Sequence, residues 1–294
     1  MEIKNLYAYS KERFPFINMA LFTILFFTVY CVATFTTGQL LHVGLNELVG
    51  SIAVISFFFR LRVFDEIKDY TIDAINHPHR VLQSGRIKLK HLIRISVMGG
   101  GIEIAWSFAN GSQSLWWWLA ALFFAVLMRY EFFISTFLKK QLLLYAFSHM
   151  LIMPLIVTWV WSAYIPVSLQ ENLVLLSSLS LFSGFAFEIA RKIHIPDKEK
   201  PLIDSYSKEL GYKVSITLVV FVLFMGVLTQ FQLLQQISDA RWPFLLIGSL
   251  YLLIIGFYMA AIFKPQEKKI RTSEVMVSLF MLFSYFSILI EIIL

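Results

Sequence analysis

Three aspartates of this sequence recur at every fourth position between residues 65 and 73. Asp65, Asp69 and Asp73 share one face if the segment is helical. Glu66 is three residues before Asp69 and joins that face. Like charges at this spacing destabilise a helix unless positive charge lies between them. Mg²⁺ could supply that charge, because it prefers oxygen ligands and typically takes one or two carboxylates together with substrate phosphates.

Basic residues flank this acidic face, and they allow a second interpretation. Arg62 and Lys68 would neutralise the acids in a solvated surface helix that binds no metal. Pro78 predicts that the helix ends at or just before His77, because proline cannot continue a helix and restricts the residue before it. Arg80 then lies just beyond the helix end, where its planar guanidinium group can bind phosphate oxygens.

The elements that must position these residues are long and apolar. Hydrophobic residues make up 58% of the 294 residues and charged residues only 15%, a composition typical of membrane proteins. About 20 apolar residues are needed to cross the hydrocarbon layer. The sequence therefore predicts an all-α, polytopic transmembrane bundle in one domain, residues 1–294, with about nine spans. These lie near 16–36, 45–60, 93–110, 115–133, 141–163, 173–190, 214–236, 243–263 and 275–294.

The basic residues indicate which side of the membrane holds the acidic helix end. With the N-terminus inside, all of the 25 Lys and Arg residues except Arg241 fall in inner segments, as the positive-inside rule requires. We therefore expect an integral protein of a bacterial inner membrane, with its N-terminus and the loops 61–92 and 191–213 in the cytoplasm. The net charge of +6 then reflects contact with anionic membrane lipids, and we expect no nucleic-acid partner.

The acidic segment resembles a motif of the UbiA-type intramembrane prenyltransferases. That family usually shows N-D-x-x-D-x-x-x-D at the cytoplasmic end of its second helix, followed by P-x-R and a Ser-Gly-Arg turn. Asp69 and Asp73 match directly. Asp65 stands at the Asn position and Glu66 at the first Asp position. The later residues that fall in step are Pro78, Arg80, Ser84, Gly85 and Arg86.

The family's second Asp-rich motif, between its helices six and seven, is altered in this sequence. The family's closing Gly-x-Lys segment matches Gly211-Tyr212-Lys213. Asp204 and Lys208 resemble an Asp pair whose second acid is replaced by lysine, one residue out of register. We expect Arg191 and Lys208 to contact diphosphate oxygens directly. Glu188, near the inner end of the sixth span, is expected to take part, because ionisable groups at membrane depth are usually functional.

The resemblance implies Mg²⁺-dependent transfer of an isoprenyl group from an isoprenyl diphosphate to a lipophilic acceptor within the membrane. It implies metal binding by the acids of the first motif, namely Asp65, Glu66, Asp69 and Asp73. The expected catalytic residues are Asp69, Asp73 and Arg80. The expected substrate-binding residues are Arg62, Arg80, Glu188, Arg191, Lys192, Asp204 and Lys208.

Other functions and other polar residues stay open at this stage. A UbiA-type protein could instead cyclise the prenyl chain or transfer phosphoribosyl to a lipid phosphate. A non-catalytic transporter or lipid-binding scaffold could keep the same helical bundle. Glu131 and His149 lie within or beside predicted spans, where each is either a site residue or a locally paired group, Glu131 with Arg129.

Overall fold

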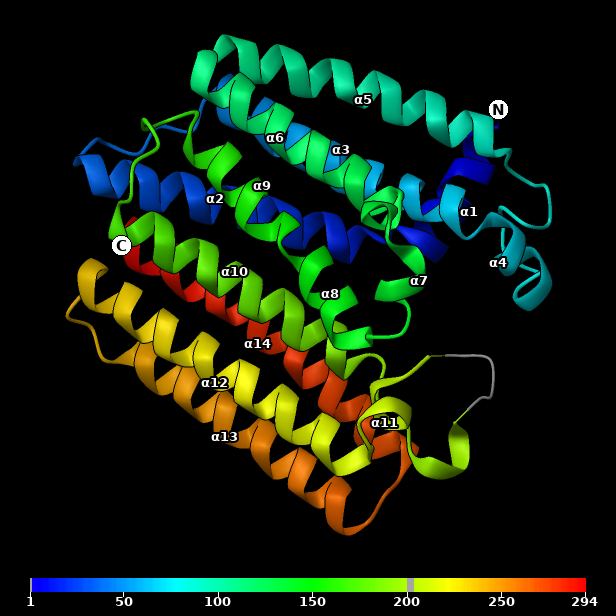
Figure 1. The fold of residues 1–294 in the computed structure, drawn as a ribbon. Helices are drawn as coiled ribbons and strands as arrows, with labels where there is room; N and C mark the ends of the chain where they lie inside the picture. The colour runs from blue at the N-terminus through cyan, green and yellow to red at the C-terminus, as the bar shows by residue number, and fades with distance from the viewer. Residues whose placement is uncertain (1, 200–203) are drawn as a thin grey trace.

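Every regular element in the part of the chain that the structure describes is a helix. The computed structural model describes residues 2–199 and 204–294, and Figure 1 shows the helices side by side in one bundle. They are α1 (Ile3–Arg13), α2 (Phe16–Thr37), α3 (Leu45–Lys68), α4 (Tyr70–Asn76), α5 (Leu89–Ala109), α6 (Ser112–Arg129), η1 (Glu131–Phe133), α7 (Ser135–Leu138), α8 (Leu142–Met150), α9 (Ile152–Trp161), α10 (Glu171–Ala190), η2 (Pro196–Lys198), α11 (Tyr206–Glu209), α12 (Tyr212–Ile237), α13 (Trp242–Phe263) and α14 (Glu267–Ile293).

The long helices confirm the predicted membrane bundle. Among the described residues, 7 helical stretches are long and apolar enough to cross a membrane: α2, α5, α8 with α9, α10, α12, α13 and α14. Two further predicted spans coincide with α3 and α6, which pack against α5 in the same bundle. Charges near the end of α3 and the polar start of α6 make these two less apolar. The count of about nine spans therefore stays a prediction.

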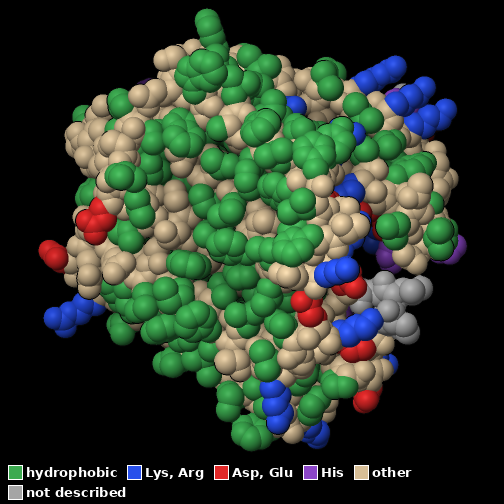
Figure 2. All heavy atoms as spheres, viewed as in Figure 1, with side chains coloured by type: hydrophobic (Ala, Val, Ile, Leu, Met, Phe, Trp, Pro, Cys, Tyr) green, Lys and Arg blue, Asp and Glu red, His purple; other side chains and the backbone are tan. Residues whose placement is uncertain are grey.

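Charged side chains gather at one end of the bundle. Figure 2 shows most of the visible Lys, Arg, Asp and Glu side chains on the right-hand side of this face, where α4, α7 and α11 lie in Figure 1. Apolar side chains cover most of the remaining visible surface. The first and last long helices, α2 and α14, pack against each other, and α2 also packs against α3. Segments far apart in the sequence thus pack side by side in the bundle.

A close approach between α3 and α5 fixes the helix that carries the acidic residues. A Cβ atom added at Gly99 would lie 1.9 Å from Ser56 Oγ, so a larger residue would force the Ser56 side chain out of its present position. Beside it, Glu103 is fully buried and accepts hydrogen bonds from Ser56 Oγ (2.8 Å), Arg60 Nη2 (2.9 Å) and Trp118 Nε1 (2.9 Å). These contacts join α3, α5 and α6 and restrict the rotation of α3 about its axis.

The acidic helix end has the predicted form, with one irregularity. α3 ends at Lys68 and α4 begins at Tyr70, because Asp69 has φ −96° and ψ 6°. The hydrogen bonds nevertheless continue across this residue: Asp69 N donates to Asp65 O (2.9 Å), and Asp73 N donates to Asp69 O (2.8 Å). α4 ends at Asn76, which confirms the predicted end just before His77. The helical stacking of Asp65, Asp69 and Asp73 is thus largely kept.

Candidate active site

A cavity of about 510 Å³ opens among the ends of α1, α3, α4, α8 and α10. One part of its wall carries charged and polar side chains, and the other part is apolar. The polar part is lined by Arg13, Arg62, Asp65, Lys68, Asp69, Asp73, Arg80, Arg129, Tyr145, His149, Glu188, Arg191 and Lys192. The apolar part includes Phe58, Leu61, Phe64, Ala125, Met128, Ala146, Met150, Ile152 and Met153. Such a cavity suits a ligand with an anionic head and a hydrocarbon tail.

Asp65 and Asp69 present oxygen atoms to this cavity. The Asp65 side chain is 53% exposed, and its oxygens lie 3.9 Å from Arg62 Nη1 and 4.0 Å from Lys68 Nζ. Asp69 makes no hydrogen bond or ion pair with any described side chain. Burial raises the pKa of Asp69, Asp65 and Asp73 add in the same direction, and Lys68 opposes them. Asp69 is therefore a carboxylate that would gain from a nearby cation.

Asp73 is neutralised by two arginines from different segments. Arg80 Nη1 lies 2.6 Å from Asp73 Oδ2, as a residue just beyond the helix end can. Arg13, which ends α1, lies 3.7 Å from the same oxygen. All three residues line the cavity. The ion pairs hold both guanidinium groups at the rim, where they can also meet phosphate oxygens.

Glu66 is buried beside Arg13 and Arg62, two residues that line the cavity. Its side chain is 1% exposed and accepts from Arg13 Nε (2.8 Å), Arg62 Nη2 (2.6 Å) and Tyr9 Oη (3.4 Å). Glu66 is not among the residues that line the cavity. All three contacts are made to Oε1, so this oxygen holds Arg13 and Arg62 in position. The second oxygen, Oε2, is buried and has no hydrogen-bond partner among the described residues.

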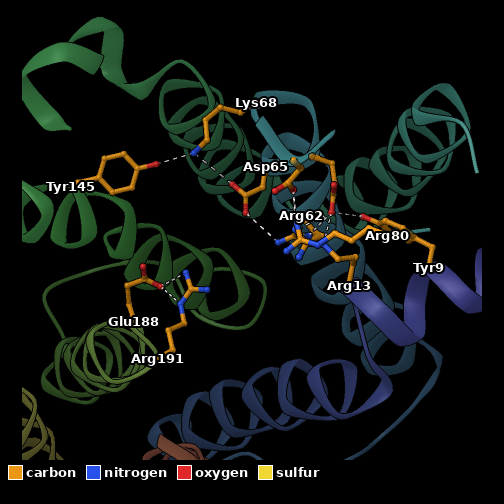
Figure 3. Close-up of polar contacts among 11 residues, drawn as sticks. Tyr9, Arg13, Arg62, Asp65, Lys68, Arg80, Tyr145, Glu188 and Arg191 are labelled. Atoms are coloured by element: carbon orange, nitrogen blue, oxygen red, sulfur yellow. Dashed lines mark hydrogen bonds and ion pairs between the residues drawn. The ribbon is translucent and has the colours of Figure 1, made fainter. Parts of the chain in front are cut away.

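The wall opposite the aspartates is formed by the end of α10. Arg191 Nη2 lies 2.5 Å from Glu188 Oε2, and Lys192 Nζ lies 2.8 Å from Glu188 Oε1. All three residues line the cavity. Figure 3 shows the Glu188–Arg191 pair on α10 and Asp65 on α3 as separate groups of this site.

The predicted pair Asp204 and Lys208 does not reach the cavity. Asp204 is exposed, and neither residue is part of the cavity wall. The Ser205 hydroxyl accepts a hydrogen bond from the Lys208 backbone N–H (3.1 Å), so this stretch starts the short helix α11. Of the residues predicted from the second loop, the structure brings Glu188, Arg191 and Lys192 into the site.

Arg13, Lys68 and Tyr145 line the cavity but were not among the predicted site residues, whereas His149, whose role was left open, also lines it. Arg13 looked like one of many inner-face charges, although its place directly before the first span was a usable signal. Lys68 donates to Tyr145 Oη (2.8 Å), and His149 stacks on Tyr145 with ring centroids 4.1 Å apart (Figure 3 shows the Lys68–Tyr145 contact). Glu131 is not paired with Arg129, because the structure places Lys139 3.3 Å from its carboxylate.

Asp65 and Asp69 supply too few ligands to bind a metal ion alone, so a phosphate group must supply others. No group of three His, Cys, Asp or Glu side chains within residues 2–199 and 204–294 is arranged to hold a metal. Asp65 and Asp69 together could supply one or two carboxylate ligands, and Mg²⁺ commonly completes such a set with substrate phosphates and water. The donor set thus suits Mg²⁺ that arrives with a phosphorylated ligand.

The comparison with known families agrees with this geometry. Residues 20–284 match the model of the UbiA prenyltransferase family. The chain belongs to the UbiA prenyltransferase family. Members of this family are prenyltransferases, and the family match covers most of the helical bundle. No curated protein matches the chain.

Solved structures of UbiA-family proteins share this fold. A digeranylgeranylglyceryl phosphate synthase is 18% identical, with 99% of each chain covered and a TM-score of 0.68. A UbiA homologue from Aeropyrum pernix K1 is 14% identical, with 89% of this chain and 96% of that chain covered and a TM-score of 0.64. A UbiA homologue from Archaeoglobus fulgidus, bound to GPP and Mg²⁺, is 10% identical, with 92% and 96% covered and a TM-score of 0.53.

Proposed function

We propose that this UbiA-family protein transfers an isoprenyl group from an isoprenyl diphosphate to a lipophilic acceptor in the membrane. One observation carries the proposal: a single cavity joins a charged rim to an apolar floor. A diphosphate needs the first and a hydrocarbon chain needs the second. Isoprenyl diphosphates combine the two.

The charged rim supports the diphosphate part of the donor. Arg13, Arg62 and Arg80 line one side, and each is held by a carboxylate of α3 or α4. Arginine–phosphate contacts are charge-assisted and often bidentate, so these groups would fix the position of the head group. Arg191 and Lys192 approach from α10 on the opposite side.

Asp65 and Asp69 are the residues that would hold Mg²⁺ beside the diphosphate. The metal would supply positive charge where negative charge develops on the leaving group. Support for this part comes from the free carboxylate of Asp69 and from the A. fulgidus homologue, whose structure contains GPP and Mg²⁺. Asp73 instead orients Arg80, because the two form an ion pair at 2.6 Å.

The apolar floor would hold the isoprenyl chain and exclude water. Phe58, Phe64, Met128 and Met153 line this part, and the Tyr145 ring also lines the cavity. Cleavage of the allylic C–O bond leaves its electron pair on the diphosphate and positive charge on the chain. Aromatic faces stabilise such charge, and the dry wall protects it from attack by water. The acceptor then forms the new bond to the chain and gives up a proton.

Turnover by the purified protein tests this function. The full chain is incubated with farnesyl or geranylgeranyl diphosphate, a membrane lipid extract and Mg²⁺, and products are identified by mass spectrometry. Prenylated lipid together with released diphosphate is expected, and EDTA should stop both. A cyclised hydrocarbon would indicate a cyclase, and phosphoribosyl transfer from a phosphoribosyl diphosphate would indicate that alternative. Absence of turnover with every donor would favour a non-catalytic scaffold.

We also propose that the cavity opens to the cytoplasm of a bacterial cell. The single cysteine, Cys31, is buried, so cysteines introduced at exposed positions can be labelled selectively. Ser84→Cys and Lys198→Cys lie at the charged end of the bundle and should resist a membrane-impermeant reagent added to intact cells. Labelling of both without permeabilisation would reverse the proposed orientation.

A further inference from the structure

We propose that the α10 side of the cavity binds the diphosphate directly through Arg191 and Lys192, without a second metal ion. In this assignment Glu188 pairs with the two cations until the diphosphate arrives, and it is not a metal ligand. The inference rests on the proposed function, since it concerns how the same head group is held. It also specifies the site further: metal on the α3 side, side-chain cations alone on the α10 side.

The first argument is that both oxygens of Glu188 already have cationic partners. Arg191 contacts Oε2 at 2.5 Å through both Nε and Nη2, and Lys192 contacts Oε1 at 2.8 Å. A metal ion at Glu188 would have to displace two positive charges or lie against them. Asp69 offers the opposite case, a carboxylate without an ion pair among the described residues. A divalent cation is therefore favoured on the α3 side and disfavoured at Glu188.

The second argument is that no other carboxylate of this segment faces the cavity. Glu199 accepts hydrogen bonds from the hydroxyls of Ser205 and Ser207, and Glu209 accepts from the Leu142 N–H. Asp197 and Asp204 are exposed, and neither lines the cavity. The remaining positions 200–203 are Lys, Pro, Leu and Ile, so the sequence itself supplies no acid there.

The third argument is that hydrogen bonds to other segments hold the backbone of Arg191 and Lys192 in place. The Arg191 carbonyl accepts from Arg271 Nη1 (3.4 Å), and the Lys192 carbonyl accepts from the N–H of the fully buried Tyr206 (3.2 Å). Their side chains keep 48% and 27% exposure, respectively, so their heads can turn from Glu188 to an arriving anion. Positions fixed in advance lower the entropy cost of binding.

A purely structural role is the main alternative. Basic side chains near the C-terminus of a helix interact favourably with its dipole, and cytoplasmic loops collect positive charge for topology. Both effects apply to Arg191 and Lys192 at the end of α10. Neither effect predicts that these residues, more than other cations of the same loop, influence the binding of a diphosphate.

Binding of inorganic pyrophosphate in EDTA distinguishes a diphosphate-binding role of Arg191 and Lys192 from a purely structural one. The full chain in detergent is titrated by calorimetry without any divalent metal. Wild type should bind, and Arg191→Gln or Lys192→Gln should each bind about ten- to a hundredfold more weakly, the range expected for one lost charge-assisted hydrogen bond. Lys198→Gln is the matched control, because Lys198 is exposed on the same loop and outside the cavity wall. Unchanged affinity in both variants, or no metal-free binding by wild type, overturns the proposal.

The number of bound Mg²⁺ ions and the Glu188→Gln variant give a second, independent readout. With saturating pyrophosphate, one Mg²⁺ per chain is expected, and two would overturn the proposal. Glu188→Gln releases the two cations, so it should bind pyrophosphate in EDTA at least as tightly as wild type and keep the same Mg²⁺ count. A lower Mg²⁺ count in that variant would make Glu188 a ligand. These assays need no turnover, so their failure is separate from failure of the proposed function.

Discussion

The two sides of the cavity use the same helical spacing to opposite effect. On α3 and α4, Asp65 and Asp69 are one turn apart and leave carboxylate oxygens facing the cavity. On α10, Glu188 is followed at three and four residues by Arg191 and Lys192, which neutralise it within the same helix end. Residues at these spacings meet in any helix. Each acid is followed at three residues by a cation, Lys68 on α3 and Arg191 on α10, so the two sides differ at the fourth residue, which is Asp69 on the α3 side and Lys192 on the α10 side.

Two adjacent acids of α3, Asp65 and Glu66, also differ in whether they can reach a ligand. Asp65 turns toward the cavity and is 53% exposed, whereas Glu66 turns away and is 1% exposed. Successive helical residues point about 100° apart, so adjacent acids cannot share one site as easily as acids four residues apart. Glu66 organises arginines in the protein interior, and Asp65 is available to a ligand.

The sharpest test of the comparison is to remove one acid from the α3 side. Asp69→Asn should lower Mg²⁺-dependent turnover by about three orders of magnitude, because loss of a metal ligand removes several kcal/mol of transition-state stabilisation. Turnover at saturating Mg²⁺ is measured for Asp69→Asn and Asp204→Asn, with Asp197→Asn as an exposed-loop control. Asp204→Asn and Asp197→Asn should remain close to wild type. Equal losses of turnover for Asp69→Asn and Asp204→Asn would mean that metal binding is not confined to the α3 side.

The second test separates the two adjacent acids of α3. Glu66→Gln breaks buried ion pairs to Arg13 and Arg62, and removing one partner of such a pair costs about 3–5 kcal/mol. We expect a clearly lower thermal unfolding temperature in detergent, with Mg²⁺ affinity per folded molecule close to wild type. Asp65→Asn should show the reverse pattern, because Asp65 is partly exposed at the cavity. A stable Glu66→Gln protein with lost Mg²⁺ affinity would make Glu66 a metal ligand.

Helical regularity explains what could be predicted from the sequence. The apolar segments anticipated the long helices, and Pro78 anticipated the end of α4 at Asn76. The four-residue repeat placed Asp65, Asp69 and Asp73 together, because the spacing alone fixes their common face. The three-residue spacing to Asp69 suggested that Glu66 would join them, but Glu66 does not line the cavity. Arg13 and Arg62 cover the face to which Glu66 belongs.

Contacts between distant segments explain what could not be predicted. Arg13 meets Glu66 across 53 residues of sequence, and Lys68 meets Tyr145 across 77 residues. No local spacing encodes such pairs, since they depend on how α1 and α8 pack against α3. The loop after α10 has no helical period to fix its register. Asp204 and Lys208 therefore resembled a motif in sequence and lie outside the cavity wall in space.

A third test asks whether the rim extends to α1. Arg13→Gln should weaken binding of an isoprenyl diphosphate about ten- to a hundredfold, because one charge-assisted contact to the head group is lost. Lys11→Gln is the matched control, since Lys11 is exposed on the same helix. Donor affinity is measured by calorimetry, with thermal unfolding recorded for both variants. If both variants bind alike, Arg13 serves only to pair with Glu66 and Asp73.

The smallest expected effect is a pH dependence confined to the α3 side. Burial raises the pKa of Asp69 above that of an ordinary aspartate, and Mg²⁺ binds only the ionised carboxylate. As pH falls through this raised pKa, protonated Asp69 competes with the metal, and apparent Mg²⁺ affinity should fall by about tenfold per pH unit. The loss should begin at a higher pH than an aspartate with an ordinary pKa would give.

The measurement compares wild type with Asp69→Asn. Mg²⁺ is titrated into each protein with pyrophosphate present, over about pH 4.5 to 8. Pyrophosphate also binds protons, but it does so equally in both titrations, so the difference between the two proteins isolates Asp69. That difference should shrink as pH falls, because protonated aspartic acid and asparagine are both neutral. A constant difference in Mg²⁺ affinity across the range would mean that Asp69 does not titrate there.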